Sequence, residues 1–253
     1  MQNNTDHLTG KTALVTGASS GIGRAVASLL AKKGVRVAHV SRRPSLSEDI
    51  GAPKSTPSMA LAADVSDPQS ISKAVAQAWE AFGGIDYVVN AAGVGTPAPL
   101  EDLTPDVWRR EIDINLSGSF YVARETGLRM RERGQGSIVL VGSELSLIGM
   151  DKLAHYCASK SGLVGLTKAL ATELAPTVRV NCVCPGPVDT PMMEEEIQWF
   201  GGTEEVRNQA VERVPLKRIA TPEEIAAFIV FTLVDAEFAT GSILSIDGGT
   251  TAL

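Results

Sequence analysis

The sequence predicts an α/β domain in which helices cover both faces of a doubly wound, parallel sheet of about seven strands. Short β-branched runs alternate along the chain with longer segments whose apolar residues recur every three or four positions. This alternation is typical of βαβ units, whose right-handed crossovers build a parallel sheet. Polar residues do not interrupt the apolar runs at residues 13–15 and 138–141, as expected of strands buried on both faces.

Each element has its own signal in chain order. Seven segments have the composition of strands: residues 12–16, 35–41, 59–63, 87–90, 137–141, 178–183 and 243–246. Five segments have helical periodicity: residues 23–33, 70–82, 105–133, 156–175 and 222–234. A capping side chain precedes a proline near three of the expected helix starts: Asp67-Pro68, Thr104-Pro105 and Thr221-Pro222. An irregular stretch at residues 43–58 is rich in Pro and Ser and is expected to face solvent. No linker or internal repeat divides the pattern, so residues 1–253 are expected to form a single domain.

Composition narrows the class of protein. The 253 residues contain 23 Lys and Arg against 29 Asp and Glu, a net charge of −6, which disfavours binding to nucleic acid or to anionic membranes. The longest apolar stretch, residues 225–234, is about half of what a bilayer requires. Residues 1–7 show neither the charged nor the apolar region of a signal peptide, and the three cysteines cannot all pair. We therefore expect a reduced, cytoplasmic protein with no nucleic-acid or membrane partner.

A glycine-rich turn follows the first expected strand and leads into a helix. It reads Thr16-Gly17-Ala18-Ser19-Ser20-Gly21-Ile22-Gly23. Glycines there allow a tight turn, close approach of the backbone to phosphates, and close packing of the helix on the sheet, and the helix start favours a pyrophosphate. The turn predicts a Rossmann-type nucleotide site formed by Gly17, Ser19, Ser20, Gly21, Ile22 and Gly23. The spacing is not that of the general GxGxxG fingerprint, so an ordinary glycine-rich turn is the alternative.

The end of the second strand indicates which dinucleotide binds. In such folds this end lies beside the adenine ribose, where an acid suits the 2′-hydroxyl of NAD and basic residues suit the 2′-phosphate of NADP. The chain reads Ser41-Arg42-Arg43 and has no carboxylate there. A hydroxyl and two guanidinium groups form charge-assisted bonds to a phosphate. The sequence therefore favours NADP, with NAD as the alternative cofactor and two solvated arginines as the alternative interpretation.

Tyr156 and Lys160 are four residues apart in an expected helix, so their side chains share one face. A phenol with a pKa of about 10 transfers protons poorly at neutral pH, and a neighbouring ammonium group lowers that pKa. The pair predicts a proton-transfer site. The alternative is a tyrosine at the edge of the core beside a surface lysine.

Two polar residues are expected near this pair. Ser143 follows the fifth strand, at the carboxyl edge of the sheet where ligands bind in open α/β folds, and its hydroxyl could hold a carbonyl oxygen. Asn115 lies in the long helix expected at residues 105–133. A buried amide in mid-helix needs a hydrogen-bond partner, and helix propensity does not explain it.

Taken together, these motifs resemble those of the short-chain dehydrogenase/reductase family in its compact single-domain form. The resemblance extends from Lys11 to Gly249. The matching motifs, in order, are Thr16-Gly17-x3-Gly21-Ile22-Gly23, Asp64-Val65, Asn90-Ala91-Ala92-Gly93, Asn115, Ser143, Tyr156-x3-Lys160 and Pro185-Gly186. One motif departs from the family, because its usual Asn-Asn-Ala-Gly is here Asn90-Ala91-Ala92-Gly93. Some NADP-preferring members have a basic residue where this chain has Ser20, so the preference would depend on Arg42 and Arg43.

The resemblance also implies roles for these residues. Tyr156 would be the general acid/base, and Lys160 would lower its pKa and hold the nicotinamide ribose. Ser143 would orient the substrate oxygen, and Asn115 would support a water relay to Lys160. The remaining implied cofactor-binding residues are Asp64 and Val65 at the adenine, Asn90, Ala91 and Gly93 along the cofactor, Pro185 and Gly186 beside the nicotinamide, and Val188 and Thr190.

A segment at about residues 187–215 resembles the family's mobile substrate loop. Its apolar residues are candidates for a cavity wall that closes over the substrate: Met192, Met193, Trp199 and Phe200. Candidates for the opposite wall are Leu145, Leu147, Ile148, Met150 and Leu153. These walls favour a moderately apolar ketone or alcohol. The acidic run at residues 194–196 is interpreted as a solvated helix face.

Other reactive side chains are interpreted as structural. Cys182 and Cys184 alternate on one face of a buried strand, and with only three histidines in the chain we expect buried thiols and no metal site. Cys157 is expected to pack beside Tyr156, and His155 is an alternative acid/base. The helix at residues 156–175 is apolar on more than one face, which implies a second copy of the chain, and the resemblance suggests a homotetramer.

The combined prediction is an oxidoreductase that transfers a hydride between NADP(H) and a small ketone or secondary alcohol. The alternative is a non-catalytic, nucleotide-sensing Rossmann module. Ser143, Tyr156 and Lys160 favour the enzyme, because a sensor does not need all three at catalytic positions.

Overall fold

The strands form one parallel sheet in the computed structural model, which describes residues 8–43 and 58–252. The strands are β1 Thr12–Thr16, β2 Arg36–Ser41, β3 Met59–Ala62, β4 Tyr87–Asn90, β5 Gly136–Val141, β6 Val178–Pro185 and β7 Ile243–Ile246. Their order is β3-β2-β1-β4-β5-β6-β7, and every neighbouring pair is parallel. The predicted α/β fold and its seven strands are confirmed. The irregular stretch lies, apart from its first and last residues, outside the described residues.

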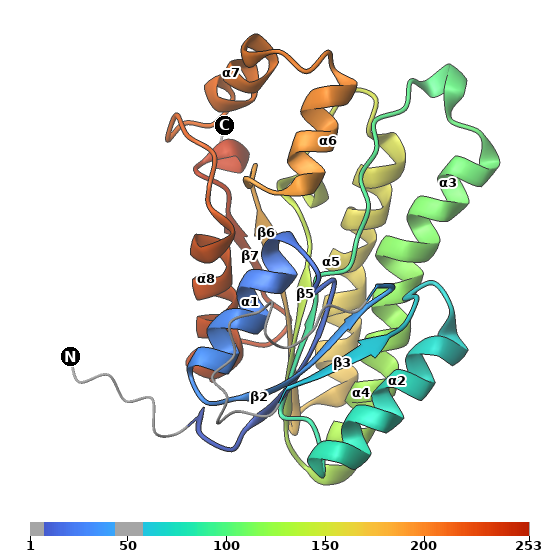
Figure 1. The fold of residues 1–253 in the computed structure, drawn as a ribbon, viewed down its shortest axis with the longest axis vertical. Coiled ribbons are helices and arrows are strands. Elements are labelled where there is room, and N and C mark those ends of the chain that lie inside the picture. The colour runs from blue at the N-terminus through green and yellow to red at the C-terminus, as the bar shows by residue number, and fades with distance from the viewer. Residues whose placement is uncertain (1–7, 44–57, 253) are drawn as a thin grey trace.

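Helices cover both faces of this sheet (Figure 1). On one face, α1 Gly21–Lys32 packs against α8 Pro222–Val234. The other face is covered by α2 Pro68–Phe82, α4 Gly118–Arg133 and α5 Ala154–Leu174. Each face buries its own cluster of aliphatic side chains, because strands in a parallel sheet present apolar residues on both sides.

The long helix expected at residues 105–133 is divided in the structure. It consists of α3 Pro105–Ile112, a π-helical turn at Asp113–Ser117, and α4. Asn115 lies in this turn and is fully buried. Because a π-helical turn adds a residue to the helix, it re-aims the side chains inside it, and such turns often occur at functional sites.

The segment expected as a substrate loop contains two helices, α6 Pro191–Trp199 and α7 Glu204–Glu212. Thr190 and Thr203 cap them by accepting hydrogen bonds from the amides of Met193 and Val206. Both helices lie beyond the carboxyl ends of the strands (Figure 1). They therefore cover the edge of the sheet where the site was expected.

The sheet has its topological switch point between β1 and β4. From β1 the chain proceeds outward to β2 and β3, and from β4 it proceeds the other way to β7. Open α/β sheets bind ligands in the crevice beyond the carboxyl ends of the strands at this point. None of the helices in residues 8–43 and 58–252 is long and apolar enough to cross a bilayer.

Candidate active site

The turn between β1 and α1 has the geometry of a phosphate cradle. Gly17 has a φ of +67°, and a side chain there would meet the backbone of Ala91 and Ala92 at 2.7–2.8 Å. A side chain at Gly23 would meet the Gly17 carbonyl and push α1 away from β1. Within the described residues the Ser20 side chain does not cap α1, so the first amides of the helix are available to an anion. These residues fit the pyrophosphate of a dinucleotide.

The ends of β2 and β3 lie side by side at one end of this crevice. Arg42 and Arg43 are exposed there, and the Ser41 hydroxyl donates a hydrogen bond of 2.8 Å to the Arg43 carbonyl. The Asp64 carboxylate accepts hydrogen bonds from the hydroxyl and amide of Ser66, which lower its pKa, and Arg42 lowers it further. The residues predicted at the adenine end are therefore neighbours, with a positive charge among them.

Asn90, the last residue of β4, uses its side chain to join three elements. Its Oδ1 accepts a hydrogen bond of 2.6 Å from the Thr16 hydroxyl, and its Nδ2 donates one of 2.6 Å to Ser119 in α4. These bonds hold the end of β4 so that the backbone of Ala91 and Ala92 lies against the glycine turn. Any contact of Asn90 with a cofactor would therefore be made by its backbone, because its side chain is committed to the fold.

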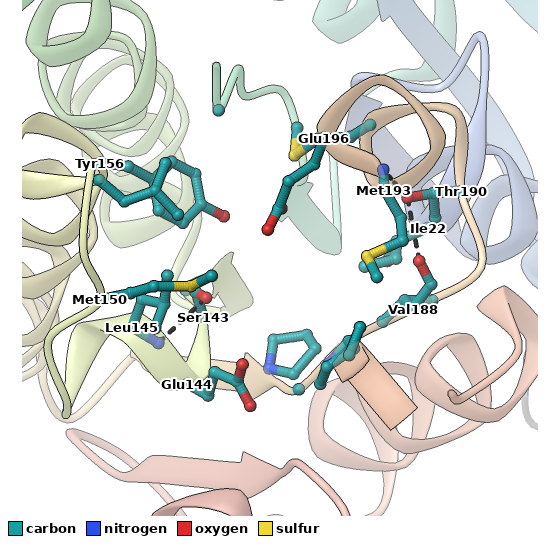
Figure 2. Close-up of a pocket in the computed structure, with 18 of the residues that line it drawn as sticks. Ile22, Ser143, Glu144, Leu145, Met150, Tyr156, Val188, Thr190, Met193 and Glu196 are labelled. Carbon is teal, nitrogen blue, oxygen red and sulfur yellow. Dashed lines mark hydrogen bonds between the residues drawn. The ribbon is translucent and has the colours of Figure 1, made fainter. Parts of the chain in front are cut away.

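Ser143 and Tyr156 meet in a cavity at the carboxyl edge of the sheet. Ser143 follows β5 and caps the short helix at Glu144–Ser146, accepting a hydrogen bond of 3.1 Å from the Leu145 amide. The Tyr156 hydroxyl points into the same cavity, which Ser143 also lines (Figure 2). The cavity has a volume of about 130 Å³. Five predicted cofactor residues also line it: Ile22, Pro185, Gly186, Val188 and Thr190.

The expected lowering of the Tyr156 pKa is wrong for this structure. Burial raises the pKa of Tyr156, the Ser143 hydroxyl lowers it, and the carboxyls of Glu111, Glu196 and Glu144 raise it further. The Lys160 ammonium lies 5.7 Å from the centroid of the phenol ring and donates a hydrogen bond of 2.9 Å to the Val141 carbonyl. Burial shifts the pKa of Lys160 in the opposite direction, below its usual value. Desolvation therefore outweighs the effect that the spacing of the pair predicts, and Tyr156 is a neutral phenol at pH 7.

Asn115 and Lys160 lie together behind Tyr156. A side chain at Gly93 would meet Asn115 Oδ1 at 3.2 Å and Lys160 Nζ at 3.5 Å. Asn115 accepts a hydrogen bond of 2.9 Å from the Val94 amide, and donates one of 2.8 Å to the Val94 carbonyl and one of 3.0 Å to Ser159. The partner required by the buried amide is thus the loop that follows β4.

His155 points away from the cavity. It is fully buried, its Nε2 lies 3.0 Å from the Thr96 carbonyl, and burial lowers its pKa. This neutral imidazole is part of the core, so it does not serve as the alternative acid/base. Cys182 and Cys184 are also buried, with their Sγ atoms 3.8 Å apart, and no group of three metal-ligating side chains occurs in the described parts of the chain.

The predicted walls of the cavity are only partly correct. Met192 and Met193 line one side, and Leu145, Met150 and Leu153 line the other. The remaining candidates, Leu147, Ile148, Trp199 and Phe200, do not line it. The Trp199 and Phe200 rings instead pack edge to face with centroids 4.8 Å apart, and the Lys152 ammonium lies over both.

Three charged residues of the cavity are not predicted from the sequence: Glu144, Glu196 and Arg213. Of the acidic run, Glu194 and Glu195 are exposed as expected, whereas Glu196 points into the cavity. Helical spacing indicates this orientation, because Glu196 lies three residues after Met193 and shares its face of α6, and Met193 is buried. Glu144 directly follows Ser143 in the sequence. Its place in the cavity depends on the burial of the short helix Glu144–Ser146, which the sequence does not reveal.

A dinucleotide cradle that opens beside a serine and a tyrosine hydroxyl is the arrangement of a single-domain, dinucleotide-dependent oxidoreductase. A family model described as enoyl-(acyl carrier protein) reductase matches residues 17–251. The chain belongs to the short-chain dehydrogenase/reductase family, which uses a nicotinamide dinucleotide as cofactor.

Known proteins align with almost the whole chain. A D-threitol dehydrogenase from Mycolicibacterium smegmatis is 41% identical over 250 residues, which cover 96% of this chain and 94% of that protein. An NAD-dependent glycerol dehydrogenase from Listeria innocua is 36% identical over 247 residues, covering 97% of this chain and 95% of that one. The structure of an aldohexose dehydrogenase from Thermoplasma acidophilum superposes with a TM-score of 0.89 at 31% identity, covering 98% of this chain and 96% of that chain.

Proposed function

We propose that this protein transfers a hydride reversibly between NADP(H) and a secondary alcohol or its ketone, with Tyr156 as the general acid/base. The observation that supports this most directly is that Ser143 and Tyr156 line one cavity beside the dinucleotide cradle, with the Tyr156 hydroxyl pointing into it. The relatives named D-threitol dehydrogenase and NAD-dependent glycerol dehydrogenase support the same type of reaction. The nicotinamide supplies or accepts the hydride, and the residues of the chain orient the substrate and move the proton.

The proton is exchanged at the Tyr156 hydroxyl. Because burial raises the pKa of Tyr156, the phenol is protonated at neutral pH and ready to donate to a carbonyl oxygen during reduction. Ser143 donates a hydrogen bond that holds this oxygen in place. In the oxidative direction Tyr156 accepts the proton of the alcohol after losing its own, and the Lys160 charge stabilises the phenolate.

Asn115 and Lys160 act behind the phenol. Lys160 holds the nicotinamide ribose, and Asn115 supports a water relay that returns protons from Lys160 to solvent. The side-chain amide of Asn115 bonds Val94 and Ser159, so it also positions the loop that carries Gly93. In this role Asn115 is a positioning residue, because its contacts are with the protein.

The preference for NADP over NAD is proposed from the end of β2. Arg42 and Arg43 are exposed there and have no carboxylate beside them in the Ser41-Arg42-Arg43 sequence. Two guanidinium groups suit a 2′-phosphate. NAD is the alternative, since one relative is named NAD-dependent. Titration of the protein with both reduced dinucleotides tests the preference, and tighter binding of NADH would refute it.

We also propose a cytoplasmic homotetramer. On α5, Val164 and Leu166 are partly exposed and Ala169 is exposed, although the helix already buries one face on the sheet. Light scattering after size exclusion should give about four times 26.6 kDa, and a mass of one chain would refute the assembly.

Turnover is tested by following the absorbance of the reduced cofactor with a panel of ketones and secondary alcohols. Oxidation of NADPH by at least one ketone supports the enzyme. Tight dinucleotide binding without turnover of any compound would favour a nucleotide-sensing module instead.

A further inference from the structure

Two carboxyl groups lie inside the cavity close to the proposed acid/base. Glu196 extends from α6 toward the Tyr156 hydroxyl, and Glu144 lies on the other side of the cavity beside Ser143 (Figure 2). Both carboxyls raise the pKa of Tyr156, and Glu196 also raises the pKa of Glu144. A substrate whose oxygen reaches Ser143 and Tyr156 therefore lies in the same cavity as two glutamates.

The Glu144 carboxyl has an oxygen with no partner. The residue is only 6% exposed, so its carboxyl is largely removed from solvent. Its Oε2 is fully buried and makes no hydrogen bond within the described residues. A buried acceptor without a donor is unfavourable, and a ligand that donates a hydrogen bond relieves this.

The charges around the cavity favour a neutral ligand. Burial raises the pKa of Glu144 to about 7 and that of Glu196 above its usual value, while Arg213 lowers both. One guanidinium therefore faces two carboxyl groups. A phosphate, sulfonate or carboxylate on the substrate would meet these groups at close range, whereas a hydroxyl donates to a carboxylate and accepts from a protonated carboxyl.

We propose that Glu144 and Glu196 bind hydroxyl groups on either side of the reacting carbon, so that the substrate is a neutral polyol or sugar. This inference rests on the proposed function, because it names the substrate class of the same site. It replaces the moderately apolar substrate that the sequence favours, since two of the residues expected to make the cavity apolar, Trp199 and Phe200, lie outside it.

A polyol satisfies this site in a way that a simple alcohol does not. One hydroxyl of the polyol reacts at Ser143 and Tyr156, and its neighbours donate hydrogen bonds to Glu144 and Glu196. A monofunctional alcohol places methyl groups there instead and leaves buried carboxyl oxygens unpaired. Sites built to bond a hydroxyl discriminate strongly against analogues that lack it, for this reason.

The test uses four-carbon alcohols that differ in hydroxyl count: 2-butanol, 2,3-butanediol and butane-1,2,3,4-tetrol. The kcat/KM of the full-length enzyme is measured for each with the oxidised cofactor, using all three stereoisomers of the tetrol. We expect kcat/KM for the best tetrol to exceed that for 2-butanol by about 100-fold or more. In Glu144→Gln and Glu196→Gln we expect this ratio to fall by about tenfold or more, mainly through KM. Glu195→Gln is the matched control, because Glu195 is exposed on the same helix.

The outcomes separate this inference from the proposed function. If 2-butanol is oxidised as efficiently as the tetrols, or if both glutamine variants keep the wild-type ratio within about twofold, the hydroxyl sites are refuted and the oxidoreductase stands. If no alcohol is oxidised and no ketone reduced although the dinucleotide binds, both proposals fail. Thermal unfolding of each variant confirms that a lost preference does not reflect a lost fold.

Discussion

Gly17→Ala tests the dinucleotide cradle, and its effect can be estimated from the structure. Gly17 has a φ of +67°, a conformation that costs a residue with a side chain about 1–2 kcal/mol. The added methyl carbon would lie 2.7 Å from the amide nitrogen of Ala92 and 2.8 Å from the carbonyl of Ala91. These are backbone atoms that a side-chain rotation does not move, and overpacking of this kind costs a further 1–3 kcal/mol, roughly. We expect a total loss of about 3 kcal/mol in unfolding free energy.

Denaturant unfolding measures the stability, and calorimetric titration with NADPH measures the binding. Because the same backbone must approach the pyrophosphate, the Kd of NADPH should rise about tenfold or more. Gly149→Ala is the matched control, since a methyl group there would meet nothing within 4 Å, and its stability should stay within about 0.5 kcal/mol of the wild type. Wild-type stability and wild-type Kd in Gly17→Ala would refute the proposed close approach.

Two further predictions concern charge. Replacing Arg42 and Arg43 together by Ala should lower the preference for NADP over NAD in kcat/KM by about tenfold or more. Stability should not fall, because both side chains are exposed. An unchanged ratio of kcat/KM for the two cofactors would place the 2′-phosphate elsewhere. Burial raises the pKa of Glu111 from 4.5 to about 7, so the folded state binds more protons than the unfolded state between these values, and stability falls as the pH rises through this range. Glu111→Gln should therefore be more stable than the wild type at pH 8, by up to about 3 kcal/mol, and this gain in unfolding free energy should disappear near pH 4. Denaturant unfolding measures both stabilities. Equal stability of the two proteins at pH 8 would contradict the buried charge.

The strands were predictable because the strands of a parallel sheet are buried on both faces and must be apolar on both. Runs such as residues 138–141 are apolar throughout, and only burial on both faces accommodates them. The glycine turn was equally predictable, because the backbone at Gly17 and the packing at Gly23 exclude side chains at these positions. The boundaries of the strands follow from the same sequence features and shift by at most two residues in the structure.

The details of the site depend on tertiary contacts that the sequence does not display. Periodicity shows a continuous helix at residues 105–133, whereas the side chain of Asn115 bonds the distant Val94 loop within a π-helical turn. Burial decides the pKa of Tyr156, and the spacing to Lys160 gives no information on burial. An acidic run is usually solvated, and only the orientation of α6 directs Glu196 inward.

The central claim is that the Tyr156 hydroxyl exchanges a proton with the substrate oxygen. The most direct test compares the wild type with Tyr156→Phe in kcat/KM on the preferred substrate and in the Kd of NADPH, with Tyr121→Phe as a control at a tyrosine that does not line the cavity. We predict that Tyr156→Phe lowers kcat/KM by about 10³-fold or more while the Kd changes by less than about threefold. A Tyr156→Phe enzyme that retains more than about a tenth of wild-type kcat/KM would contradict the assignment.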